Sequence, residues 1–160
     1  MNHTFSNWTP KEVPRFHERL VAFSVPSENR QVLLLCYNEL KIMDLSDPPS
    51  VRTLPVSYGY DPFSFLPESP ILNFMDQQWH LIGLEPGEPI VSRPNGQKLI
   101  VDEPRLEISV VDGNGPVWSD NYENFSDDWV AATFSPDYRY IVLGCPYDFD
   151  FRVWECQLIS

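Results

Sequence analysis

Residues 130–156 read VAATFSPDYRYIVLGCPYDFDFRVWEC and contain three short apolar runs separated by polar turns. The first run ends at Ser135-Pro136-Asp137, and the last closes on Val153-Trp154-Glu155. Short apolar runs bounded by Pro, Asp and Ser are typical of β-strands joined by tight turns. The stretch therefore predicts three consecutive strands, and nearly all of the chain after Leu20 has the same character.

Three other stretches repeat this order of strand, proline-containing turn and strand. Residues 21–45 and 89–113 are copies that close on an apolar residue and an acid, and residues 63–84 are a weaker copy without the acid. Two of the four units are clear and two are degraded. The turn prolines of the four copies are Pro26, Pro67, Pro94 and Pro136. Because repeats of about 40–45 residues with several strands each are typical of propeller blades, we interpret the copies as blade-like units.

The stretch Phe134-Ser135-Pro136-Asp137, followed by Tyr140–Gly144 and Val153-Trp154-Glu155, resembles the WD-repeat family. In that family an apolar strand ends in Ser-Pro-Asp and a later strand ends in Trp-Asp. The chain has no Gly-His dipeptide, which the family normally carries, and Glu155 stands at the position of the Asp. The resemblance implies local blade structure, and a closed ring in this family needs more blades than this chain supplies.

We therefore expect a single all-β domain over residues 1–160, with the architecture of a small or partial β-propeller of about four blade-like units. A β-sandwich is the alternative, since its turn signals have a similar spacing. Both folds predict at least about a third of the residues in strands and under about 15% in helix. The expected divisions are an N-terminal arm at 1–20 and units at 21–56, 63–88, 89–119 and 130–160.

One segment has a weak helical pattern. Residues 10–20, PKEVPRFHERL, follow Thr9 as a candidate N-cap, with Pro10 at the first helical position. Pro14 removes a backbone donor inside the segment. We therefore expect a turn or two of helix there at most.

The apolar runs of the repeated units predict the hydrophobic core. Residues 32–37, VLLLCY, form a continuous apolar run, which is typical of a strand buried on both faces. The expected core residues are Leu33, Leu35, Ile42, Ile100, Ile108, Phe134, Ile141, Leu143 and Val153.

The last repeated unit ends soon after its third strand, at Leu158-Ile159-Ser160, and would leave an open strand edge. Residues 4–9, TFSNWT, alternate in character and contain aromatics. We expect them to return, pair with that edge and close the array, which gives a monomer. If they do not return, the edge is expected to pair with a second chain in a homodimer.

Charge and composition restrict the partners. The formal net charge is −12, from 23 acids and 11 bases without a basic cluster, which argues against nucleic acid and anionic membrane surfaces. The N-terminus lacks an apolar signal segment, and no run reaches the length of a membrane span, so we expect a cytoplasmic protein. Cys36, Cys145 and Cys156 have no CxxC spacing and are expected to be reduced thiols.

Motifs for catalysis are sparse. The chain has no HExxH, no histidine pair at ligand spacing and no glycine-rich phosphate loop, so we expect no metal and no cofactor. Cys145 lies near Asp148 and Asp150, whose charges would raise the thiol pKa and weaken a nucleophile. His80, with Asp76 nearby, is the one candidate base for a hydrolase or lyase that uses loop carboxylates.

Residues 115–129, GPVWSDNYENFSDDW, are the candidate binding surface. Aromatic anchors among acidic side chains favour a protein partner that is basic or positively charged. The candidate partner-binding residues are Trp118, Tyr122, Glu123, Phe125, Asp127, Asp128 and Trp129. In a competing interpretation, Trp118 and Trp129 end strands and pack inward, which leaves the acids in water.

These observations favour a non-enzymatic protein–protein interaction module with an acidic, aromatic-lined surface. Two alternatives stay open. One is the hydrolase or lyase that uses His80, and the other is a small acidic inhibitor of a basic protein.

Overall fold

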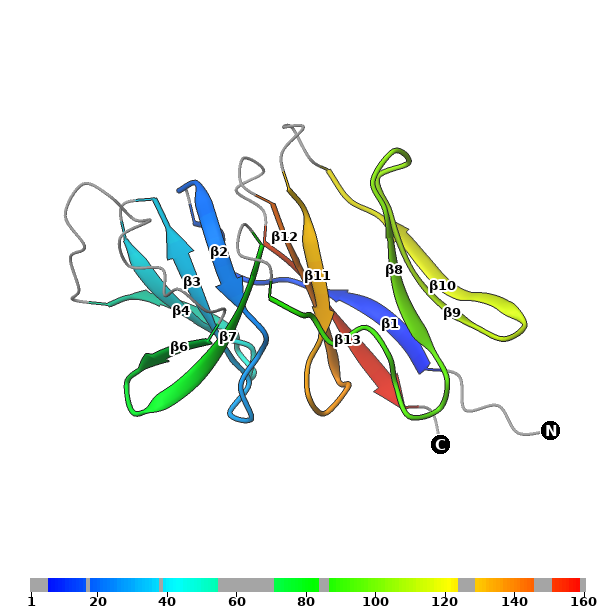
Figure 1. Ribbon diagram of the computed structural model, residues 1–160, viewed down its shortest axis with the longest axis horizontal. Helices are drawn as coiled ribbons and strands as arrows, with labels where there is room; N and C mark the ends of the chain where they lie inside the picture. Colours follow the sequence, from blue (N-terminus) through cyan, green and yellow to red (C-terminus); the bar gives the residue numbers. More distant parts are fainter. Residues whose placement is uncertain are drawn as a thin grey trace.

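The computed structural model describes residues 6–16, 18–37, 39–54, 71–83, 87–123, 129–145 and 151–158. Within these ranges the chain forms thirteen strands and no helix. The strands make three sheets, of six, four and three strands, and none of the sheets is closed (Figure 1). The all-β prediction is confirmed, whereas these open sheets do not by themselves show a propeller. No described helix is long and apolar enough to cross a membrane.

The six-stranded sheet has the order β5-β4-β3-β2-β7-β6. Its first four strands form an antiparallel meander: β2 (Leu20–Ser24), β3 (Gln31–Cys36), β4 (Leu40–Asp44) and β5 (Ser50–Thr53). The hairpin of β6 (Ile71–Phe74) and β7 (Gln77–Gly83) joins the sheet where β7 pairs with β2. The strand predicted at 32–37 corresponds to β3 of this meander.

The four-stranded sheet contains the stretch quoted at the start. It has the order β1-β13-β12-β11, with β11 (Ala131–Phe134), β12 (Tyr140–Gly144) and β13 (Arg152–Leu158). The fourth strand, β1 (Ser6–Lys11), pairs antiparallel with β13 along its whole length. The prediction that the N-terminal segment covers the edge of the last strand is confirmed for the described residues.

The three-stranded sheet has the order β10-β9-β8, with β8 (Lys98–Asp102), β9 (Glu107–Asp112) and β10 (Gly115–Asn121). An extended segment before β8 connects the three-stranded sheet to β11. The amide of Phe134 donates to the carbonyl of Ile90 at 2.8 Å, and Ser92 forms a bridge with Lys98. This segment therefore tethers the three-stranded sheet to the four-stranded one.

The sheets stack as layers, with the four-stranded sheet in the middle (Figure 1). All five residues of β12, YIVLG, are buried. Tyr140 and Val142 pack in a cluster with residues of the six-stranded sheet, and Ile141 and Leu143 pack in a second cluster with residues of the three-stranded sheet. Because successive side chains point to opposite faces, the middle sheet is covered on both sides.

The same alternation explains β3 in the six-stranded sheet. Val32 and Leu34 face the middle sheet, whereas Leu33 and Leu35 lie in a third cluster with Trp79 of the β6–β7 hairpin. The hairpin thus packs on residues of the meander's outer face. The prediction of a strand buried on both faces is confirmed.

One prediction about the core is wrong, and the candidate helical segment contains no described helix. Ile100 is 45% exposed, whereas the other eight predicted core residues are buried. The neighbouring Leu99 of β8 is buried instead, so Ile100 points to the outer face of the three-stranded sheet. The helical turn at 10–20 is absent from the described residues, because residues 10 and 11 continue β1 and residues 12–16 are irregular. Pairing with β13 provides hydrogen-bond partners for the backbone groups of residues 10 and 11, which a helix would otherwise have to provide.

The three cysteines are buried and form no disulfide. Burial is the main cause that raises the pKa of the Cys36 thiol, with the charge of Glu18 as a second cause. The prediction of free thiols is confirmed. Pro67 and residues 63–70 of the weakest predicted unit lie outside the described residues, and the boundaries of the four units stay predictions.

Candidate functional site

Three turns, at residues 27–31, 93–97 and 135–140, share one backbone hydrogen-bond pattern. In each turn the amide of the fourth residue donates to the carbonyl of the first, and the amide of the first donates to the carbonyl of the last. The fourth residue has a positive φ in all three: Arg30 (62°), Gly96 (89°) and Tyr138 (59°). The turns come from three layers and lie at the same end of the molecule, the lower edge of Figure 1.

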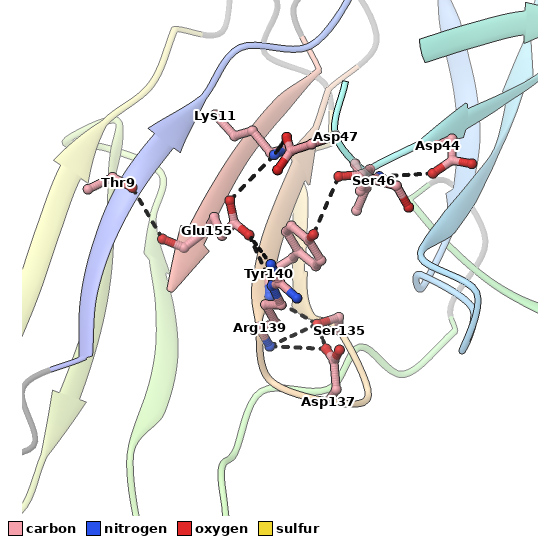
Figure 2. A network of polar contacts seen from close by, with 11 residues as sticks. Thr9, Lys11, Asp44, Ser46, Asp47, Ser135, Asp137, Arg139, Tyr140 and Glu155 are labelled. Carbon is pink, nitrogen blue, oxygen red and sulfur yellow. Dashed lines mark hydrogen bonds and ion pairs between the residues drawn. The ribbon is translucent and has the colours of Figure 1, made fainter. Parts of the chain in front are cut away.

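Ser135 and Asp137 fix the turn between β11 and β12. The Ser135 hydroxyl donates to Asp137 Oδ1 at 2.6 Å and accepts hydrogen bonds from the amides of Arg139 and Tyr140 at 3.1 and 3.0 Å (Figure 2). Asp137 Oδ1 accepts the Arg139 amide as well, at 3.1 Å. Ser and Asp side chains commonly bond nearby backbone in this way. The Ser-Pro-Asp motif thus holds the backbone of Arg139 in a fixed place.

A network of ion pairs joins the middle sheet to the six-stranded sheet. Glu155 Oε2 on β13 lies 2.9 Å from Arg139 Nη2 and accepts a hydrogen bond from Arg139 Nε at 3.0 Å. The other carboxylate oxygen, Glu155 Oε1, lies 3.4 Å from Lys11 Nζ. Lys11 Nζ also contacts Asp47, in the loop after β4, at 2.5 Å. The hydroxyl of Tyr140 donates to the carbonyl of Leu45 in the same loop at 3.4 Å (Figure 2). These contacts position the loop after β4 beside the β11–β12 turn.

The network favours the charged forms of its members. Burial lowers the pKa of Lys11, but the contacts with Asp47 and Glu155 outweigh burial and raise it overall. The hydrogen bond from Lys11 lowers the pKa of the Asp47 carboxyl, and the hydrogen bond to Glu155 raises the pKa of Arg139. Lys11, Asp47 and Arg139 therefore carry their charges at neutral pH.

A hollow of about 730 Å³ lies among the turns and this network, and we call it the arginine hollow. Three guanidinium groups line it, one from each of the three turns. The lining residues are Arg30, Asp47, Arg93, Asp137, Tyr138, Arg139, Glu155 and Cys156. Three of the chain's eight arginines meet here, in a protein whose net charge is −12. The described lining residues carry as many positive as negative side chains, whereas the whole chain has a large excess of negative charge.

The three arginines differ in what holds them. Arg93 lies 5.6 Å from the centre of the Trp8 ring and donates to Gln97 Oε1 at 2.7 Å. Arg139 lies 5.6 Å from the centre of the Tyr140 ring and pairs with Glu155. For Arg30, the described part of the chain provides no hydrogen-bond or ion-pair partner to the guanidinium. Arg30 is therefore the arginine with the most unused hydrogen-bonding capacity.

A second hollow, of about 620 Å³, lies at the same end and contains His80. His80 is exposed on β7, and the acids that line this hollow with it are Glu28 and Glu88. Asp76, the predicted helper of His80, lines a different hollow at the β6–β7 turn. The structure therefore does not bring the predicted pair together in one pocket. Among the described residues, no group of three or more His, Cys, Asp or Glu is placed to hold a metal ion.

The aromatic side chains of the predicted binding segment pack inward where the structure describes them. Trp118 on β10 lies 5.6 Å from Trp154 and 6.3 Å from Trp8, measured between ring centres. Trp129 stacks on Phe23 at 6.4 Å, in a different cluster. Both tryptophans are half-buried and pack inward, as the competing interpretation expects, but Trp118 lies within β10 and Trp129 lies outside the strands, so neither ends a strand.

The other residues of that segment do not complete a surface with the tryptophans. Tyr122 is buried, whereas Glu123 is exposed and its carboxylate lies 3.9 Å from Arg152. Phe125, Asp127 and Asp128 lie outside the described residues. Partner binding by the seven residues stays a prediction.

Tyr122 offers a direct check on the packing of this segment. It is 3% exposed, and its hydroxyl has no hydrogen-bond partner among the described residues. Burial, followed by the charge of Glu103, raises the pKa of Tyr122 to about 12. Replacing Tyr122 with Phe is expected to keep the free energy of unfolding unchanged or raise it by up to about 1 kcal/mol, because an unpaired buried hydroxyl is removed. Urea unfolding measures the change.

The matched control is Tyr140→Phe, which removes a hydroxyl that does have an acceptor, the carbonyl of Leu45. It is expected to cost about 0.5–1.5 kcal/mol. If Tyr122→Phe costs more than Tyr140→Phe, the Tyr122 hydroxyl is bonded and the described packing is wrong there.

Sequence reasoning missed the arginine hollow, although a signal was present. Arg30, Arg93 and Arg139 each lie within four residues of a turn proline of the repeated units, at Pro26, Pro94 and Pro136. A basic residue beside the same turn in three copies predicts a shared basic site if the turns lie at one end of the fold.

Comparison with known proteins adds no relative to this picture. No protein-family model matches the sequence, no curated protein is similar to it, and no solved structure matches its fold.

Proposed function

We propose that this chain is a non-enzymatic protein–protein interaction module that uses the end of the molecule at which the three turns meet. The observation that carries the proposal is the convergence of turns from three layers around two hollows. Rigid strands that position several loops at one end are a common arrangement for binding another macromolecule. A contact surface assembled from three sheets is also broader than a single turn provides.

We also propose that the sheets act as blade-like units of a small or partial β-propeller. Two observations support this. The middle sheet has both faces covered by other sheets, as a blade between two neighbours does. Its outermost strand, β1, comes from the other end of the sequence and pairs with β13. Such pairing covers an open edge within one chain and supports a monomer.

A cytoplasmic location belongs to the same proposal. Cys36, Cys145 and Cys156 are buried, and none forms a disulfide. Free thiols are usual in reducing compartments, whereas secreted domains of this size more often use disulfides.

The test is affinity capture with charge-reversal variants at the two ends of the molecule. Glu28 is exposed beside the second hollow, and Glu103 is exposed in the turn between β8 and β9, at the opposite end (Figure 1). We expect proteins captured from a lysate of the source organism by the wild-type chain to be lost with Glu28→Lys and kept with Glu103→Lys. Mass spectrometry identifies them, and light scattering gives the solution mass.

Two outcomes contradict the proposal. One is the absence of any protein captured reproducibly by the wild-type chain. The other is equal capture by both variants, which would move the contact surface away from the turns.

The hydrolase or lyase alternative has one supporting observation, the presence of His80, Glu28 and Glu88 around one hollow. A histidine and two carboxylates can act as acid and base if a substrate lies between them. A panel of model esters and glycosides, assayed with the wild-type chain and with His80→Ala, tests it. Turnover that disappears with His80→Ala would favour the enzyme over the interaction module.

A further inference from the structure

We propose that the arginine hollow binds an acidic peptide segment of a protein partner. The inference rests on the proposed interaction function and names the class of partner segment and its site. The whole-chain charge predicts a basic partner instead, so the local arrangement of charges must carry the proposal.

The three guanidinium groups of the hollow are well placed to bind a carboxylate. Stacking on Trp8 and Tyr140 orients Arg93 and Arg139, so that ordering them costs a ligand little entropy. Arg30 has no described hydrogen-bond or ion-pair partner and brings an intact planar fork of donors to the hollow. A guanidinium binds a carboxylate through two parallel hydrogen bonds, which are among the stronger contacts available to a peptide.

The charges around the hollow nearly balance. Among the residues that the structure describes, the positive groups at the site are Lys11, Arg30, Arg93 and Arg139, and the negative groups are Asp47, Asp137 and Glu155. Lys11 and Arg139 already pair with Asp47 and Glu155. The site is therefore left with a small positive excess, which suits the single charge of a carboxylate. A phosphate dianion would carry more negative charge than this excess and would face three carboxylates.

Two carboxylates form part of the rim of the hollow. Asp47 and Asp137 are exposed at the edge of the hollow. Their carboxylate oxygens can accept hydrogen bonds from backbone amides of a bound segment, which a free anion does not possess. The rim therefore favours a peptide over a small anion. The repulsion from the rest of the acidic chain is screened beyond about 10 Å at 0.1 M salt, so that contacts inside the hollow decide binding.

The experiment measures fluorescence anisotropy of a labelled serine peptide that contains a single glutamate, which matches the small positive excess of the site. The variants are Arg30→Asn and Arg93→Gln. Asparagine is chosen because position 30 has a positive φ, which asparagine tolerates well. Each variant is expected to weaken binding about tenfold, as the loss of a charge-assisted pair would. Circular dichroism confirms that each variant is folded.

The matched control is Arg105→Gln. The Arg105 side chain is 78% exposed and lies in the turn between β8 and β9, at the other end of the molecule (Figure 1). Like the hollow variants, Arg105→Gln removes one positive charge from the chain. We expect its affinity for the peptide to stay within about twofold of the wild type, because a charge at that distance is screened.

Four results would overturn the inference. The first is wild-type affinity in both hollow variants, and the second is a loss of affinity in Arg105→Gln equal to that in the hollow variants. The third is binding of a lysine–serine peptide as tight as that of the glutamate peptide. The fourth is displacement of the peptide by inorganic phosphate beyond that by sodium chloride of the same ionic strength. The last result would assign a free-anion site. If captured partners still bind Arg30→Asn and Arg93→Gln while Glu28→Lys loses them, the interaction function stands and only the acidic-peptide inference fails.

Discussion

Replacing Trp154 with alanine is expected to lower the free energy of unfolding by about 3–5 kcal/mol. Trp154 on β13 is 2% exposed and packs edge-on against Trp118 of β10, with 5.6 Å between ring centres. Its indole Nε1 donates to Asp120 Oδ2 at 2.9 Å, so the residue connects the middle sheet to the three-stranded sheet. The truncation removes a large apolar side chain, leaves a cavity between two layers and removes one of the hydrogen bonds that the Asp120 carboxylate accepts. Urea unfolding followed by circular dichroism measures the loss.

Two further variants separate the packing from the hydrogen bond. Trp154→Phe keeps most of the buried ring and loses the bond to Asp120, and we expect it to cost about 1–3 kcal/mol. Asp120→Asn keeps an oxygen acceptor for the indole and should cost less than Trp154→Phe. A loss below about 1 kcal/mol for Trp154→Ala would contradict the stacking of these two sheets.

The middle sheet shows how far local pattern reaches. The five-residue run YIVLG predicts a strand buried on both faces, and the meander from β2 to β5 follows from equally local signals. Ile100 was misplaced for a physical reason. Alternation tells which residues of β8 share a face, but whether another layer covers that face depends on the arrangement of the sheets.

The candidate sites depend still more on long-range structure. Trp118 and Trp129 occur among acids in the sequence, which fits an exposed anchor and a buried ring equally well. Their partners, Trp154 and Phe23, are distant in sequence, and packing against these rings leaves both tryptophans half-buried. The arginine hollow likewise requires turns from three layers to meet.

The segment at 10–20 shows long-range pairing deciding between two local structures. Thr9 and Pro10 form a helix-start signal, yet both lie within β1. The register pairs Pro10 with Trp154 and Lys11 with Val153. A short helix interrupted by Pro14 gains few internal hydrogen bonds, whereas the strand gains backbone pairing with β13 and buries Trp8.

Deleting residues 1–9 is expected to destabilise the protein by at least about 3–5 kcal/mol, because the deletion removes Trp8 from the core along with most of β1. Trp8 lies 5.8 Å from Phe134 and 6.3 Å from Trp118, between ring centres. The deletion also exposes the edge of β13, and an unpaired edge readily pairs with another chain. We expect a lower melting temperature together with new self-association, measured by thermal unfolding and by light scattering.

Trp8→Ala in the full chain is the control that divides these two effects. It removes the ring but keeps the backbone pairing of β1 with β13, from Ser6 opposite Leu158 to Lys11 opposite Val153. It should therefore lower stability without causing self-association. New association in the deletion alone would assign the effect to the uncovered edge, and association in both variants would assign it to general loss of structure. A deletion variant that stays monomeric and melts like the wild type would mean that β1 does not cover this edge in solution.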